Sequence, residues 1–113
     1  MTKEEAKRTI AIALHAFGKQ DQPKLVISPE DGRVELRNVS FSSSVLSYTD
    51  DRASKNVQAT KSGSQIDINF GSERGVLRFS YIVNGTVSTK EGSFSVASRD
   101  KGIEVDGRLY EVY

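Results

Sequence analysis

Cysteine is absent from the sequence, and histidine occurs once, as His15. Without cysteine the chain forms no disulfide, thiol nucleophile, zinc–thiolate site or cysteine-ligated iron–sulfur cluster. A lone histidine acting as a general base would need an orienting acid and a substrate pocket. The nearest charged residue along the chain is basic, Lys19. We therefore expect His15 to lie at a helix surface or boundary, without a catalytic role.

The chain also lacks an excess of either charge. It has 16 basic and 15 acidic residues, the net charge is +1, and the two signs are mixed along its length. Such a distribution gives little long-range attraction to phosphate. The composition therefore does not favour a nucleic-acid partner.

No long apolar run is present. The longest, residues 10–17, is interrupted by His15 and is far shorter than the ~20 residues that cross a bilayer. Glu4 and Glu5 stand where a signal peptide carries positive charges. We therefore expect no membrane partner and a cytoplasmic location.

What the sequence does contain is enough apolar material for one core. Hydrophobic residues make up 36% of the chain and charged residues 27%, which is close to the globular average and far from a disordered composition. A chain of 113 residues fits one ordinary domain and is too short for two. We therefore treat residues 1–113 as a single domain.

The N-terminal segment has the signals of an amphipathic helix over about residues 3–17. Thr2 and Glu5 have the spacing of a capping box. Apolar side chains recur every three or four residues, which predicts a single apolar stripe. Gly18 suits the left-handed position that ends a helix.

Beyond Pro23 the apolar period changes to that of strands. About eight short strands are predicted, with a bulge or corner at residues 37–38, where the alternation shifts phase. The strongest alternation places four apolar side chains on one face of a strand: Leu77, Phe79, Tyr81 and Val83. Because no second helical pattern supplies crossovers, the sheet must be antiparallel. The predicted class is α+β, one N-terminal helix packed on a strongly curved antiparallel β-meander that forms a partly closed barrel or sheet.

Two dipeptides favour tight hairpin turns. Asp106–Gly107 predicts a two-residue turn that pairs Ile103 with Tyr110. Asn84–Gly85 offers a second turn, but it competes with a turn at residues 90–92, and the sequence leaves both open.

The sequence has no recognisable catalytic or metal-binding motif. Asp50 and Asp51 are adjacent carboxylates in a predicted polar loop without the spacing of a calcium site, so we expect them to be solubilising loop residues. No Gly-x-Ser-x-Gly elbow occurs. The glycines of residues 71–75 precede a strand, not the helix that a phosphate cradle needs. We therefore predict a protein that is not an enzyme and has no cofactor or metal.

Tyrosine and arginine side chains provide the candidates for a contact surface. Both residue types are enriched at the energetic centres of protein interfaces, and tyrosine buries a large area on contact. We expect Tyr48 to be exposed beside a polar loop and Tyr113 to be exposed at the terminus. The candidate binding residues are Tyr48, Arg52, Arg78 and Tyr113.

These observations favour a non-catalytic protein-interaction module or accessory subunit. Its partner is another protein or a second copy of the chain, bound through an exposed strand edge. One alternative is a carrier with a small apolar ligand held between helix and curved sheet, in a pocket lined by Phe41, Phe70, Phe79 and Tyr81. Another is single-stranded nucleic-acid binding on an aromatic sheet face.

Overall fold

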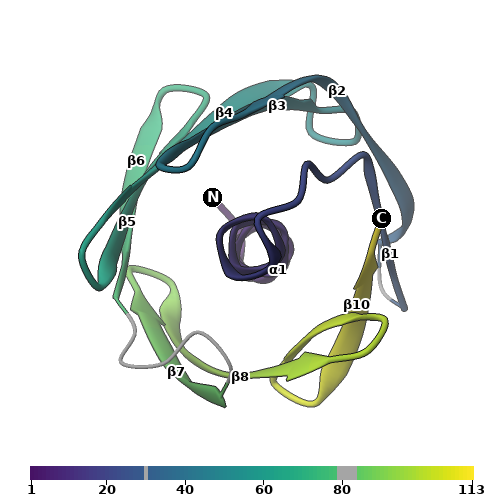
Figure 1. The fold of residues 1–113 in the computed structure, drawn as a ribbon, viewed down its shortest axis with the longest axis vertical. Helices are drawn as coiled ribbons and strands as arrows, with labels where there is room; N and C mark the ends of the chain where they lie inside the picture. Colours follow the sequence, from purple (N-terminus) through teal and green to yellow (C-terminus); the bar gives the residue numbers. More distant parts are fainter. Residues whose placement is uncertain (30, 79–83) are drawn as a thin grey trace.

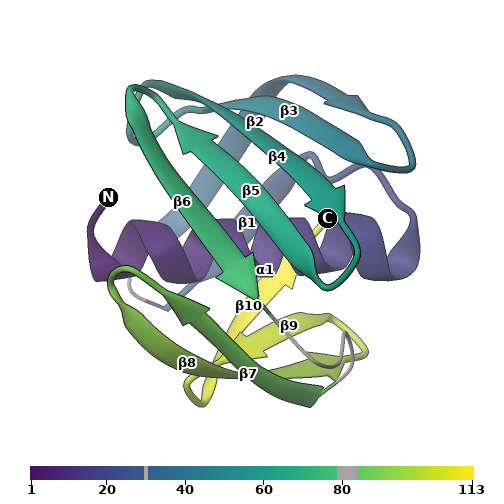
Figure 2. The ribbon, with the colours of Figure 1, turned by 90° about the vertical axis from the view of Figure 1, so that its left-hand side faces the viewer.

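One helix lies inside a ring of ten antiparallel strands in the computed structural model, which describes residues 1–29, 31–78 and 84–113. Figure 1 shows the helix, α1, end-on at the centre of the ring, and Figure 2 shows it from the side, running lengthwise through the barrel. This confirms the predicted α+β class, although the described residues form ten strands where about eight were expected.

The strands follow one another as an up-and-down meander. The elements are α1 Lys3–Lys19, β1 Leu25–Ser28, β2 Gly32–Phe41, β3 Val45–Asp50, β4 Lys55–Ser62, β5 Gln65–Phe70, β6 Glu73–Arg78, β7 Asn84–Thr89, β8 Gly92–Arg99, β9 Gly102–Val105 and β10 Arg108–Val112. Each strand pairs with its neighbours in the chain, and β1 pairs with β10 to close the ring.

The start of α1 is set by local hydrogen bonds, as the sequence predicts. The Glu5 amide donates to the Thr2 hydroxyl at 3.1 Å, and the Thr2 amide donates to the Glu5 carboxylate at 2.9 Å. Together they form a complete capping box. Burial opposes the ionisation of Glu5, but the hydrogen bonds with Thr2 and the charges of Lys55 and Arg8 together outweigh it and lower its pKa.

The end of α1 differs from the prediction. The helix continues through Gly18 to Lys19, and Gln20 adopts the left-handed conformation with a φ of 54°. The side-chain amide of Gln20 donates to the Phe17 carbonyl at 2.8 Å. That bond satisfies a carbonyl left open at the helix end and offsets the cost of a positive φ. The prediction that Gly18 ends the helix is therefore wrong.

The helix is buried on all sides, whereas its sequence predicts one apolar stripe. Ala6 and every residue from 8 to 17 are buried. In the interior of a barrel, inward-pointing strand side chains surround a helix around its whole circumference. Polar residues of α1 are therefore enclosed together with the apolar ones, and Arg8, Thr9 and His15 all lie in the interior.

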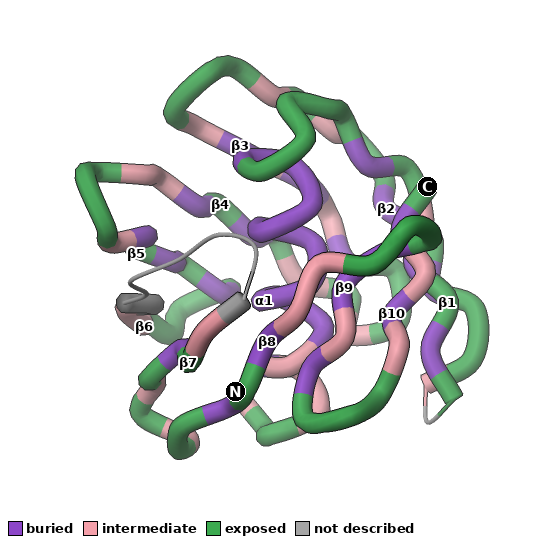
Figure 3. Tube along the Cα trace, turned by 60° about the horizontal axis from the view of Figure 1, so that its bottom comes forward, coloured by how far each residue is buried: buried purple, intermediate pink, exposed green. Residues whose placement is uncertain are grey.

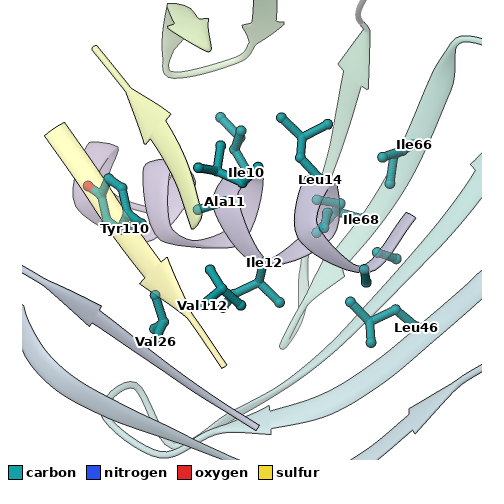
Figure 4. Close-up of a cluster of buried hydrophobic side chains, with 14 of the residues drawn as sticks. Ile10, Ala11, Ile12, Leu14, Val26, Leu46, Ile66, Ile68, Tyr110 and Val112 are labelled. Carbon is teal, nitrogen blue, oxygen red and sulfur yellow. The ribbon is translucent and has the colours of Figure 1, made fainter. Parts of the chain in front are cut away.

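The strands supply the other half of the core. Buried and exposed residues alternate along them, as Figure 3 shows, so one face of each points toward α1 and the other toward solvent. Figure 4 shows helix residues Ile10, Ile12 and Leu14 among Val26, Leu46, Ile66, Ile68, Tyr110 and Val112 of the strands. The core thus joins the first strand, the last strand and the helix in one cluster.

The hairpin at Asp106–Gly107 is confirmed. Val105 pairs with Arg108 and Ile103 with Tyr110, the register that a two-residue turn requires. Of the two competing turns earlier in the chain, the later one is correct. Thr89 pairs with Gly92 in the β7–β8 hairpin, and the Asn84–Gly85 dipeptide lies within β7.

The predicted irregularity in the second strand is confirmed as well. The pairing of β2 with β3 shifts register between Arg37 and Ser40, and Asn38 has a φ of 55°. The extra residue bends β2, which suits a strand that must follow the curve of the ring. The structure describes only part of the strand predicted around residues 76–83, because Phe79, Tyr81 and Val83 lie outside the described residues.

Gly102 provides a test of the close pairing of β9 with β10. A Cβ atom at this position of β9 would lie 2.0 Å from the Tyr110 carbonyl oxygen of the neighbouring strand. The pairing of β9 with β10 fixes the positions of the carbonyl oxygen and of the new Cβ, so neither can move away freely. Gly102→Ala should therefore lower the free energy of unfolding by about 3 kcal/mol or more, measured by urea denaturation.

Gly75 is the matched control. It lies in β6, its φ is not in the left-handed range, and an added Cβ would meet the Met1 side chain at an ordinary 3.6 Å. Gly75→Ala should change the free energy of unfolding by only about 0.5 kcal/mol. Equal effects of the two substitutions would contradict the described pairing of β9 with β10.

Candidate functional site

A buried ion-pair cluster, defined here as Arg8, Asp31 and Asp50, lies inside the barrel. Arg8 projects from α1 and contacts Asp50 at the end of β3, through Nε at 2.9 Å and Nη2 at 2.8 Å. Its Nη1 donates to Asp31 in the turn after β1. The arginine is 1% exposed and Asp50 is fully buried.

These contacts keep the guanidinium charged. Burial acts to lower the pKa of Arg8, but the charges and hydrogen bonds of the two aspartates outweigh it and raise the pKa. Asp50 also accepts a hydrogen bond from the Ala53 amide at 3.0 Å. Both carboxylates are therefore engaged in holding the helix, which leaves them poorly placed to act as general bases or metal ligands.

The sequence prediction for Asp50 is thus wrong, because it is an interior ion-pair partner and not a solubilising loop residue. Asp51 is exposed and pairs with Arg37 at 3.1 Å, in keeping with its expected place in a polar loop. Adjacent carboxylates at the end of a strand point to opposite faces, and here one face is the barrel interior. Within the described residues, no group of three or more His, Asp or Glu side chains is placed to hold a metal ion.

Tyr48 also lies in the interior. Only 3% of it is exposed, so the expectation that it forms part of an exposed contact surface is wrong. Burial, and then the nearby negative charge of Asp50, raise its pKa far above the ordinary value. Burial likewise raises the pKa of Tyr110 to about 12. Neither hydroxyl has a hydrogen-bond partner within the described part of the chain.

The other candidate residues do not form one site. Arg52 is exposed in the turn after β3, with its guanidinium beside Gly32 at one end of β1 and β2. Tyr113 is 53% exposed and bonds to Leu25 at the opposite end of β1. Arg78 is the last residue of β6, and the structure describes its backbone only.

An exposed apolar patch, which we call the β1–β10 face, lies on the outside of the closing pair of strands. It consists of the outward-pointing side chains Leu25, Ile27, Leu109 and Tyr113. Among the described residues, Ile27 and Tyr113 are the large hydrophobic side chains with the greatest exposure. Leu25 and Leu109 are half-buried.

Sequence reasoning included Tyr113 but missed the rest of this face. Residues 25–27 are apolar at consecutive positions, a sign that both sides of the strand carry apolar side chains. The neighbourhood of Ile27 and Tyr113 depends on the pairing of the first strand with the last, which no local pattern predicts.

A shallow groove of about 410 Å³ crosses the outside of β2 to β5, and its lining is mostly uncharged and polar. Asn38 donates to the Thr49 hydroxyl at 3.3 Å, and that hydroxyl donates to Asn56 at 3.0 Å. These three side chains bond to one another, and the groove is also lined by the polar side chains of Ser47, Gln58 and Asn69.

The comparisons with known proteins do not identify a relative. Neither a model of a protein family, nor a curated protein, nor a solved structure matches this chain. The described residues include no helix long and apolar enough to cross a membrane. The function must therefore be argued from the geometry of the chain itself.

The buried ion-pair cluster leads to a stability prediction. Arg8→Met leaves Asp50 buried without its counter-charge, so the free energy of unfolding at neutral pH should fall by about 3–5 kcal/mol. The triple variant Arg8→Met/Asp31→Asn/Asp50→Asn removes the stranded charges and should be more stable than the single variant. Urea unfolding of both proteins tests this, and a triple variant weaker than Arg8→Met would show that the pairing is not the cause.

His15 leads to a prediction of pH dependence. The ring is 5% exposed, which rules out the helix surface, and its Nε2 lies 3.7 Å from the carboxylate of the exposed Asp21, which places it at the boundary of the interior. Burial, and then the charge of Lys19, lower its pKa, although Asp21 opposes them. The unfolded chain therefore binds a proton at His15 more readily than the folded one.

Stability should consequently decrease as the pH falls below about 6.5, the ordinary pKa of histidine. His15→Leu removes this titration, so its free energy of unfolding should vary less with pH between about pH 7 and pH 5. Urea unfolding at several pH values measures both proteins. Identical pH profiles would mean that His15 has the same pKa in the two states.

Proposed function

We propose that this protein is a non-catalytic protein-interaction module that binds its partner through the β1–β10 face. The observation that carries the proposal is the grouping of Ile27 of β1, 36% exposed, and Tyr113, 53% exposed, which directly follows β10 and bonds to Leu25 of β1. Aromatic and aliphatic side chains grouped in this way are typical of the energetic centre of an interface.

The surroundings of the patch support this reading. Arg33 and Glu35 of β2 and Glu111 of β10 flank the apolar residues on the same outer surface. An apolar centre with a charged, solvent-accessible rim is the usual anatomy of a protein interface. The rim charges would orient a partner, and the centre would supply the buried area.

The largely closed ring favours contact through a face over the strand edge considered above. Among the described residues, every pair of neighbouring strands is joined at two or more positions except β6 and β7, which pair only at Arg78 and Ser88. Outside that seam an added strand finds few unpaired backbone groups. A partner therefore meets outward-pointing side chains, and its specificity depends on those side chains.

The interior offers less support for the carrier hypothesis. α1 occupies the space between the strands (Figure 1), the Phe41 ring packs edge-on against Phe17 with ring centres 5.5 Å apart, and Phe70 is fully buried. The other two residues of the expected pocket, Phe79 and Tyr81, lie outside the described residues. A cytoplasmic location and the lack of a nucleic-acid partner stay predictions from composition.

Affinity capture tests the proposed function. Tagged wild-type protein should retain a partner from an extract of its source cells, and Ile27→Asp should lose it, because a carboxylate in the centre of the patch must be desolvated on binding. A loss of about 2 kcal/mol reduces the affinity roughly thirtyfold.

Gln58→Asp is the matched control, because Gln58 is an exposed outward residue of β4 away from the β1–β10 face. It should capture the same partner as the wild type. Capture that is unaffected by Ile27→Asp, with the variant folded, would rule out this face as the binding surface.

A further inference from the structure

Charged residues are arranged with opposite signs on the two sides of β1. In the strand register, Ile27 lies between Arg33 on β2 and Glu111 on β10. Neighbouring strands are about 4.8 Å apart, so a positive and a negative side chain stand at equal distances on either side of an exposed apolar one. All three point outward, because the buried residues of these strands alternate with them.

The adjacent row repeats the arrangement with polar groups. Leu25 pairs with Glu35 on β2, and on its other side it exchanges backbone hydrogen bonds of 2.9 and 3.0 Å with Tyr113. A carboxylate acceptor and a phenol donor therefore flank the second apolar residue of β1. Each row would therefore pair favourably with the same row of a second copy whose β2 side faces the β10 side of the first.

This order is the one that an interface between identical copies requires. In a two-fold dimer the same patch of both subunits is used, and an axis lying in the interface along β1 exchanges the β2 side with the β10 side. Arg33 of one copy then faces Glu111 of the other, and Glu35 faces Tyr113. Ile27 meets its own equivalent on the axis.

We propose that the partner bound by the β1–β10 face is a second copy of this chain, in a two-fold dimer whose axis runs along β1. This inference rests on the proposed function, since it names the occupant of the same surface. Each contact between Arg33 and Glu111 occurs twice, and the apolar residues of β1 pair with themselves.

The contacts that these side chains make within one chain do not prevent them from pairing with the second copy instead. Arg33 lies 3.2 Å from Glu35, with the side chains 64% and 58% exposed, and the Tyr113 hydroxyl donates to Glu111 at 3.3 Å. Exposed pairs of this kind contribute little to stability. They are therefore free to re-pair across an interface.

The shape of the barrel sets the strength of the dimer. Two convex surfaces meet along a narrow band, and β1 has only four residues. The buried area therefore falls below the roughly 1,200–2,000 Å² of a stable interface. The dimer should be weak and reversible, and its formation should depend on protein concentration and on salt.

Charge reversal tests the pairing directly. Arg33→Glu alone and Glu111→Arg alone should each abolish self-association, because each places like charges opposite one another twice. An equimolar mixture of the two variants should associate again, since both contacts are then attractive. Sedimentation velocity at low salt measures all three samples. A two-fold pairing of positions 33 and 111 gives this pattern with no species larger than a dimer, whereas a head-to-tail contact would give larger species.

A cross-link tests the position of the axis. The chain has no cysteine, so Ile27→Cys introduces a single thiol. Sheets packed face to face are about 10 Å apart, too far for a direct disulfide, so a bismaleimide of about that span should join the thiol to its equivalent in the second copy. Gln58→Cys on β4 is the control and should remain monomeric under the same conditions. Equal cross-linking of the two variants would overturn the proposed axis.

The outcomes separate this inference from the proposed function. A wild-type protein that remains monomeric at high concentration, or a mixture of charge variants that fails to associate, overturns the dimer. If a different protein is then captured by the wild type and lost with Ile27→Asp, the interaction module stands without self-association. If capture is also unaffected by Ile27→Asp, both proposals fail.

Discussion

The enclosure of α1 by the ring of strands is the constraint on which the rest of the molecule depends. An eight-stranded barrel is narrow enough to be filled by its own side chains, and the diameter grows with the number of strands. Ten strands leave a wider interior. A helix with its side chains is about 10–12 Å across, which is enough to fill the centre of a molecule measuring 29 × 28 × 26 Å.

This enclosure explains why charged groups lie in the core. The hydrophobic effect is non-directional, so apolar burial alone specifies the position of an enclosed helix less sharply than hydrogen bonds with fixed geometry. The guanidinium of Arg8 has two fixed partners, one in the turn after β1 and one at the end of β3. A shift of the helix would strand three charges in the interior, so the ion pairs define the position of the helix within the ring.

The sequence predicts the local parts of this fold well. Capping at Thr2, the bulge near Asn38 and the hairpin at Asp106–Gly107 each depend on residues close together in the chain, where turn and cap chemistry act directly. The two-period pattern, helical and then extended, also identifies the α+β class. These features need no knowledge of distant partners.

The parts that were missed all depend on distant partners. Asp50 resembles a loop residue until its contact with Arg8, which lies 42 positions away, is known. Tyr48 and His15 are buried because the helix and the strands enclose one another, a fact absent from any local pattern. The exposed patch around Ile27 likewise arises only when β1 pairs with β10.

The pairing of β1 with β10 also bears on how the barrel folds. Val26 and Val112 are neighbours across this seam although almost the whole chain separates them, whereas the other pairs of strands join consecutive segments. Closing so long a loop costs entropy that only the final contacts repay. The meander should therefore wrap α1 first and the seam should form last, so that the apolar outer surface of the seam exists only in a completed barrel.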